Sequence, residues 1–168
     1  MKQSLLNRLT NQPDALDHLL FSLTEAQIRQ RPVSGKWSIF ENMAHLGRYQ
    51  EVFLERLQQI ISGDTPSFSR YVADTDPGFA DWEELSLQEL AKRLRGERLT
   101  LNAFLSILRE EQLVHIGLHP AYGAMTLEGW TEFFLLHEAH HFFTILQLGG
   151  ALRTPEQPMG FYLLPDLD

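Results

Sequence analysis

Four long segments of this chain carry apolar residues at the spacing of an amphipathic helix, and this pattern constrains the fold more than any other feature. In the second segment, for example, Ile39, Met43, Leu46 and Phe53 fall on one face. The expected helices cover roughly residues 2–23, 38–62, 86–108 and 126–149. Four helices that each need to bury one stripe can do so by packing together as a bundle.

Local signals mark where these helices begin and end. Ser38 with Glu41, and Ser86 with Glu89, have the spacing of a capping box at a helix start. Gly63 ends the second helix, and Gly149-Gly150 is expected to end the fourth. The first helix has a break near Pro13, and a short helical turn follows from Thr24 until Arg31-Pro32.

The connections are unequal in length. The stretch from Gly63 to about Leu85 is rich in Pro, Gly, Asp and aromatic residues, and we expect it to cross the length of the bundle between the second and third helices. A shorter loop, Gly117–Met125, joins the third and fourth helices. The tail, with Pro155, Pro158 and Pro165, is expected to pack across the surface without forming a helix. The sequence therefore predicts an all-α four-helix bundle, a single domain over residues 1–168.

Charge and composition exclude several functions. The formal net charge is −8 and no cluster of Lys and Arg occurs, which argues against nucleic acid and against an anionic membrane surface as partners. No apolar run approaches 18 residues, and the first residues do not resemble a signal peptide, so a cytoplasmic protein is expected. The chain has no cysteine, so any thiol chemistry must use a thiol from a substrate or cofactor.

The run His137-Glu138-Ala139-His140-His141 is the strongest chemical signal. His137 and His141, four residues apart, stack on one face of a helix, as a pair of metal ligands does. The same face carries core-type residues such as Phe134 and Ile145, so both imidazoles should point inward. A hydrogen-bonded pair of core histidines is the inert alternative. His45, beside the core residue Leu46 of the second helix, is the candidate third ligand.

The run also matches H-E-x-x-H, the signature of zinc peptidases. Such enzymes need a third ligand downstream, either a histidine or a glutamate on a later helix. After His141 no histidine follows, and the one glutamate, Glu156, lies in the Pro-rich tail. The peptidase interpretation is therefore set aside.

Two stretches resemble the DinB-like superfamily. The run Lys36–Leu46 resembles its W-S-x-x-E-x-x-x-H-L signature, and a second set of residues matches the later half of its pattern. That second set is His119-Pro120-Ala121-Tyr122-Gly123, Trp130, His137 and His141. The resemblance covers about residues 5–150, and it implies a four-helix bundle with up-down-down-up topology. One departure is Thr144, where members often have a glutamine.

The resemblance also implies a metal site. The family's three metal-binding histidines fall on His45, His137 and His141, and in related members such a site holds zinc, nickel or another divalent ion. Characterised relatives include bacillithiol S-transferases and a mycothiol-dependent isomerase. For this chain we expect a divalent metal, Zn or Ni, and a thiol-dependent S-transferase or isomerase acting on small electrophiles. Metal-dependent hydrolysis by a metal-bound water and a non-catalytic, stress-related metal-binding bundle are the alternatives.

For several residues near these histidines, the sequence allows more than one role. Glu138 is a candidate catalytic base, a carboxylate that orients an imidazole, or simply a charge at a helix interface. His140 is expected to pack beside the site, and Trp37 to pack at the entrance to the second helix. His119 is expected to cap its loop or to lie at a pocket mouth.

Two groups of apolar residues, one in the crossover and one on the fourth helix, give further predictions. In the crossover, the aromatic residues are expected to line a pocket or to anchor the loop: Phe68, Tyr71, Phe79 and Trp82. The fourth helix is apolar almost all round, and this favours a homodimer in which one of its faces is buried against a second chain. The residues that carry this prediction are Leu135, Leu136, Phe142, Phe143 and Leu146.

Overall fold

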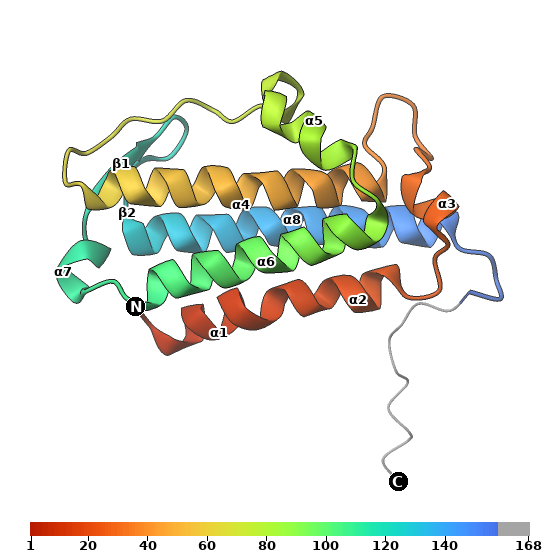
Figure 1. Ribbon diagram of the computed structural model, residues 1–168, viewed down its shortest axis with the longest axis horizontal. Helices are drawn as coiled ribbons and strands as arrows, with labels where there is room; N and C mark the ends of the chain where they lie inside the picture. Colours follow the sequence, from red (N-terminus) through yellow and green to blue (C-terminus); the bar gives the residue numbers. More distant parts are fainter. Residues whose placement is uncertain (158–168) are drawn as a thin grey trace, which may run out of the picture.

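The computed structural model describes residues 1–157, and these form a bundle of four long helical segments. Its helices are α1 (Gln3–Asn11) with α2 (Ala15–Leu20), α4 (Ile39–Ile61), α6 (Leu87–Ser106) and α8 (Leu127–Leu152). Figure 1 shows that α4 and α6 run in one direction while α1, α2 and α8 run in the other. The predicted all-α bundle with up-down-down-up topology is confirmed. Pro158 and Pro165, expected to pack across the surface, lie outside the described residues.

The predicted helix starts are correct because they depend on local hydrogen bonds. The Ser38 hydroxyl accepts from the Glu41 N–H at 3.1 Å, and the Glu41 carboxylate accepts from the Ser38 N–H at 2.7 Å. The box of Ser86 and Glu89 forms in the same way at the start of α6. The first helix breaks as expected at Pro13, where the 3-10 turn η1 (Gln12–Asp14) separates α1 from α2.

The negative charge of the Glu41 carboxylate should stabilise the fold by an amount that depends on pH. Burial alone would raise the pKa of Glu41, but hydrogen bonds from Arg31 and Ser38 outweigh it and lower the pKa to about 2. Because the folded pKa lies below the ordinary value of 4.5, this contribution is present above about pH 4.5 and is lost as the pH falls towards 2. Glu41→Gln should lower the free energy of unfolding by about 1 kcal/mol at pH 7, since Arg31 is half exposed.

Denaturant unfolding of both proteins at pH 7 and near pH 3 measures this effect. The difference between wild type and Glu41→Gln should shrink at the lower pH. Glu89→Gln is the matched control, because Glu89 occupies the same capping position without an arginine partner, and its effect should be smaller. A loss that is equal at both pH values would contradict the prediction.

The crossover is more ordered than the sequence suggested. Besides the 3-10 turn η2 (Ala73–Thr75), it contains a helix, α5 (Pro77–Glu83), that begins at an Asp76 side chain accepting from the Gly78 N–H. Phe79 and Trp82 are buried and anchor this helix on α4. Gly47 of α4 makes the contact possible, since a Cβ there would lie 2.1 Å from the Trp82 ring. The crossover predicted between the second and third helices therefore contains a helix of its own in this half.

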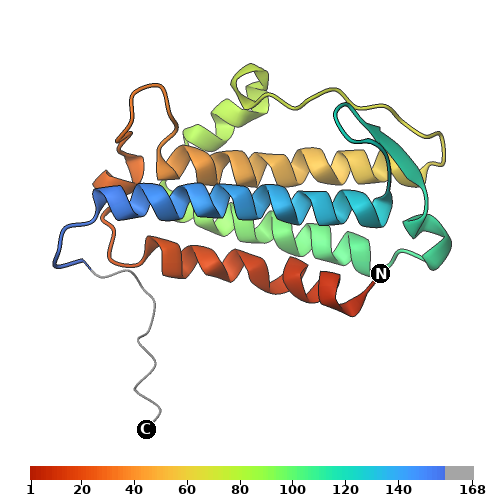
Figure 2. The same ribbon diagram turned by 180° about the vertical axis from the view of Figure 1, so that it is seen from behind.

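The expected loop before α8 is a β-hairpin. Strands β1 (Ile116–His119) and β2 (Gly123–Thr126) pair antiparallel, after a short helix α7 (Glu110–Leu113). Backbone hydrogen bonds tie the hairpin to the crossover: the Leu118 N–H donates to the Pro66 carbonyl at 2.8 Å, and the Phe68 N–H donates to the Leu118 carbonyl at 3.1 Å. Figure 2 shows the hairpin and the crossover side by side near the end of α4. Together they form a wall over that end of the bundle.

The fourth helix does not end at the two glycines. It runs through Gly149 and Gly150 to Leu152, and the Arg153 N–H donates to the Gly149 carbonyl at 3.1 Å. Arg153 packs against Gly149, with its Nη1 2.5 Å from where a Cβ would be, so a larger residue there would require this guanidinium to shift. The predicted short helix from Thr24 is present as α3 (Glu25–Arg29).

The core divides into two apolar clusters with a polar layer between them. On α6, Leu90 and Leu94 belong to one cluster and Leu101 and Leu105 to the other, with buried Arg98 in the middle. The other bundle helices contribute polar residues at the same level. These are Gln12, His45, Gln50, His137, Glu138 and His141. The candidate site lies in this layer.

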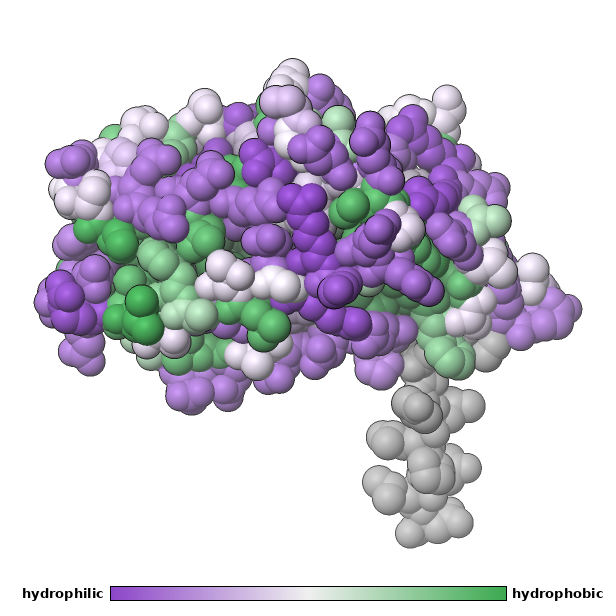
Figure 3. Space-filling model, in the orientation of Figure 1, coloured by the Kyte–Doolittle hydropathy of each residue, from purple (hydrophilic) through white to green (hydrophobic). Residues whose placement is uncertain are grey.

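The apolar residues of α8 on which the homodimer prediction rests divide between the core and the surface. Leu135 and Phe142 of α8 are buried within the chain's own core, whereas Leu136 and Phe143 are 59% and 58% exposed. Figure 3 shows a mostly hydrophilic face, with apolar side chains gathered over the parts of α1 and α6 nearest α7. Among the helices of residues 1–157, none is long and apolar enough to cross a membrane.

Candidate metal centre

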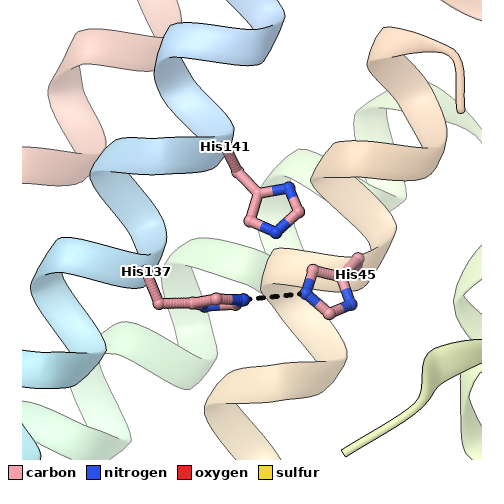
Figure 4. A group of neighbouring side chains, drawn as sticks. All are labelled: His45, His137 and His141. Carbon is pink, nitrogen blue, oxygen red and sulfur yellow. Dashed lines mark hydrogen bonds between the residues drawn. The ribbon is translucent and has the colours of Figure 1, made fainter.

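Two helices bring three imidazoles together. His45 projects from α4 and His137 and His141 from α8, and all three rings converge between the helices (Figure 4). One ring nitrogen of each histidine lies within 4.8 Å of the other two. The His45 and His137 Nε2 atoms are 3.1 Å apart. The structure thus brings together the three residues that the sequence singled out, although His45 is about ninety positions from the other two.

This geometry fits a divalent cation better than a pair of ordinary core histidines. Two nitrogens bound tetrahedrally to zinc lie about 3.3 Å apart, close to the observed Nε2 separation. The buried Nδ1 atoms of His45 and His137 have no hydrogen-bond partner among the described residues. The two Nε2 atoms contact each other, and the tautomers of the two rings decide whether that contact is a hydrogen bond. With the protons on Nδ1, both Nε2 lone pairs would be available to a cation between the rings.

Electrostatics keeps the rings in the form that binds metal. Burial, with a smaller contribution from the neighbouring imidazoles, lowers the pKa of His45 to about 3, of His137 to about 2 and of His141 to about 4. All three are therefore neutral near pH 7, with a lone pair available on each ring.

Asn42 fixes the orientation of one imidazole. Its side-chain N–H donates to the Ser38 carbonyl at 2.7 Å, which leaves its Oδ1 as the acceptor for His141 Nδ1 at 2.8 Å. His141 must then carry its proton on Nδ1, so its Nε2 lone pair is free for a metal. The sequence analysis missed Asn42, although its place one helical turn before His45 was a usable signal.

Asn42→Ala should weaken zinc binding about 10- to 100-fold, because His141 loses the partner that sets its tautomer and ring angle. Competition with a chromogenic chelator measures the affinity. Asn42→Asp keeps an acceptor at this position and should retain tight binding. Unchanged affinity in a folded Asn42→Ala protein would show that His141 needs no such partner.

The histidines lie at an open cavity of about 760 Å³. Besides the histidines, aromatic side chains on its walls are Trp37, Tyr49, Tyr71, Tyr122 and Phe133. The cavity volume is in the range of small-molecule sites.

Several of the residues expected around the site take part in this cavity. Trp37 lies 5.1 Å from the His45 ring, so it lines the cavity as well as packing at the entrance to α4. His119 does both things expected of it: its Nδ1 accepts from the Ala121 and Tyr122 N–H groups, and its side chain lies on the cavity wall.

The aromatic residues of the crossover divide between the two roles predicted for them. Tyr71 lines the cavity, whereas Phe79 and Trp82 anchor α5. Phe68 packs edge-on against Trp130 at 5.3 Å. A pocket-lining role and an anchoring role are therefore both present in this segment.

Glu138, the suggested catalytic base, lies outside the lining of the cavity. Its carboxylate forms a buried ion pair with Arg98 and accepts from Gln12 Nε2 at 2.9 Å, on the side of α8 that faces α1 and α6. Arg98 also donates to Gln50 Oε1 at 2.7 Å and to the Leu9 carbonyl at 2.9 Å. Glu138 is therefore the charge at a helix interface that the sequence also allowed. Because about 100° of rotation separates neighbouring helix positions, residue 138 points away from the ligands.

The sequence analysis also missed Arg98, the partner of this carboxylate. A signal for it existed, since position 98 lies on the apolar stripe between Leu94 and Leu101. His140, expected to pack beside the site, is exposed, and its ring lies 5.5 Å from that of His141.

Fold and site together define the class: a four-helix bundle with a three-histidine candidate metal centre between α4 and α8. The sequence matches the DinB superfamily over residues 8–145, and the chain belongs to that family. It is 23% identical over 137 residues to the uncharacterized protein YuaE of Bacillus subtilis, covering 73% of this chain and 83% of YuaE. The structure resembles that of YfiT from Bacillus subtilis, with a TM-score of 0.71 and 19% identity over 90% of this chain and 89% of YfiT.

Proposed function

We propose that this chain is a metal-dependent enzyme whose His45, His137 and His141 hold a divalent ion, Zn or Ni, and that it hydrolyses small molecules. The observation that carries the proposal is the convergence of three neutral imidazoles on an open, aromatic-walled cavity. YfiT, which has the same fold, is described as a probable metal-dependent hydrolase with an unusual four-helix bundle topology, and this supports hydrolysis. When bound to three such ligands, a divalent ion lowers the pKa of water or of a thiol and so supplies a nucleophile near neutral pH.

The chain's own residues supply the rest of the site. The three imidazoles leave room for a further ligand on the cavity side, since His45 and His141 both line it. Asn42 holds His141 in the tautomer that ligates. The aromatic walls exclude water from one side of a bound substrate and strengthen electrostatic interactions at the floor of the cavity. Glu138 has no part in this chemistry, because both its oxygens are engaged elsewhere.

Thiol-dependent S-transfer or isomerisation is the second candidate. A second cavity, of about 540 Å³, shares Trp37 and His141 with the first, so two molecules could approach the centre from different sides. A reaction between a small thiol and an electrophile needs such an arrangement, and the chain itself provides no cysteine.

Elemental analysis of tag-free protein, followed by assays with and without thiols, tests the proposal. We expect about one zinc or nickel ion per chain and metal-dependent hydrolysis of esters, amides or lactones without added thiol. Activity should be lost in His141→Ala and kept in His140→Ala, a matched control on the exposed side of α8. Turnover only when a thiol and an electrophile are both present would select the second candidate. If the protein retains metal but turns over no substrate, the result would contradict both enzymatic candidates and would favour a metal that only stabilises the bundle.

A further inference from the structure

Arg70 lies on the lining of the cavity that leads to the three histidines, and its guanidinium has no hydrogen bond or ion pair in the part of the chain that the structure describes. Each of the other arginines donates to a carboxylate or a carbonyl oxygen. Exposure alone would mean little, because water satisfies a surface guanidinium. Arg70 differs from an ordinary surface arginine because it lines the cavity and because both of its neighbours in the chain are anchored.

The residues on both sides of Arg70 are fixed to the bundle, Ser69 by its backbone and Tyr71 by its side chain. Before it, the Ser69 carbonyl accepts from Arg56 Nη2 at 2.9 Å. After it, the Tyr71 hydroxyl donates to Asp76 at 3.0 Å, and Arg48 holds Asp76 at 2.7 Å. The Tyr71 ring also stacks on His45, with 5.7 Å between centroids. Arg70 is therefore held at the cavity by anchored neighbours while its own charged group stays free, which is the arrangement of a preorganised binding residue.

A second cation strengthens the positive field at this wall. Arg56 is buried and lies 5.3 Å from the centroid of the Phe68 ring, with no carboxylate within ion-pair distance among residues 1–157. Asp74 also lines the cavity and offsets one of these two positive charges. The crossover side of the cavity still carries a net positive charge, although the chain as a whole has a net charge of −8.

We propose that Arg70 binds an anionic group, a carboxylate or a phosphate, of a small substrate whose apolar body lies against the aromatic walls. A guanidinium matches both groups through paired hydrogen bonds. The aromatic rings that line the same cavity favour a flat or apolar body. This inference deepens the proposed function and rests on it, since the substrate's other end would reach the three histidines.

Calorimetric titration of the metal-free full chain tests the proposal without relying on turnover. The probes are phenylacetate, phenyl phosphate and the neutral 2-phenylethanol. We expect at least one anionic probe to bind about tenfold more tightly than the neutral one, and its affinity to fall as salt is added. The anion that binds more tightly identifies the group that Arg70 prefers, a carboxylate or a phosphate.

Variants at Arg70 give the decisive comparison. Arg70→Gln should remove about a tenfold preference for the anion, and Arg70→Lys should keep part of it. Arg109→Gln is the matched control, since Arg109 is exposed and lies outside the cavity, and it should behave as wild type. Equal binding of anionic and neutral probes, unchanged binding in Arg70→Gln, or no binding of either anion at millimolar concentration would each overturn the proposal.

The same titrations separate this inference from the proposed function. If zinc fails to bind but the metal-free chain still prefers anions through Arg70, only the proposed metal chemistry is wrong. If zinc binds and Arg70→Gln has no effect, only the role of Arg70 is wrong. Anion binding that appears with zinc alone and is independent of Arg70 would place the anion on the metal and overturn the inference.

Discussion

His45→Ala is expected to lower the affinity for zinc by about 100- to 1,000-fold. A four-ligand structural site binds zinc with about 10–16 kcal/mol, so each ligand contributes roughly 2.5–4 kcal/mol. His45 is also the one ligand that α4 supplies. Without it, both remaining histidine ligands come from α8, and the metal no longer bridges two helices. Chelator competition on tag-free protein measures the loss, and any metal-dependent activity should disappear with it.

Two further variants separate ligation from folding. His45 is buried, so its removal also leaves a cavity. His141→Ala removes a less buried ligand and should weaken zinc binding to a similar degree with less loss of stability. His140→Ala changes an exposed histidine of the same helix and should bind zinc as wild type does. If all three variants bind zinc equally well, the metal lies elsewhere.

Arg98→Met should destabilise the fold by about 3–5 kcal/mol. The variant leaves the Glu138 carboxylate buried at 1% exposure without its cationic partner, and an uncompensated buried charge has a cost of that size. Burial raises the pKa of Glu138 while Arg98 lowers it, so removing Arg98 shifts the carboxyl towards its protonated form. The variant also breaks the hydrogen bonds that link α6 to Gln50 and to the Leu9 carbonyl. Urea unfolding of both proteins measures the difference.

The double variant Arg98→Met with Glu138→Leu should recover much of this stability, because it removes both charges together. Arg95→Ala is the control, since its pair with Asp17 is exposed and should contribute little. The double variant should also keep zinc affinity, because Glu138 touches none of the ligands. A folded double variant that binds zinc but loses all turnover would restore a catalytic role for Glu138.

Features that depend on neighbours in the chain could be predicted from the sequence. The boxes at Ser38 and Ser86, and the break at Pro13, follow from hydrogen bonds within one helical turn. Features set by distant contacts could not. Gly149 was expected to end a helix, but Arg153 packs against it and α8 continues to Leu152. The hairpin before α8 is supported by the crossover through Leu118, and that contact has no local sequence signal.

The site divides in the same way. By itself, the sequence determined the helical stripes, the pairing of His137 with His141 on one face, and the choice of His45 as their partner, which a family resemblance supported. Only the tertiary structure decided which side of α8 faces the cavity, and so turned Glu138 towards Arg98 and Asn42 towards His141. It also placed Arg70 at the cavity. The physical reason is that helix periodicity fixes which residues share a face, whereas the packing of four helices fixes what each face meets.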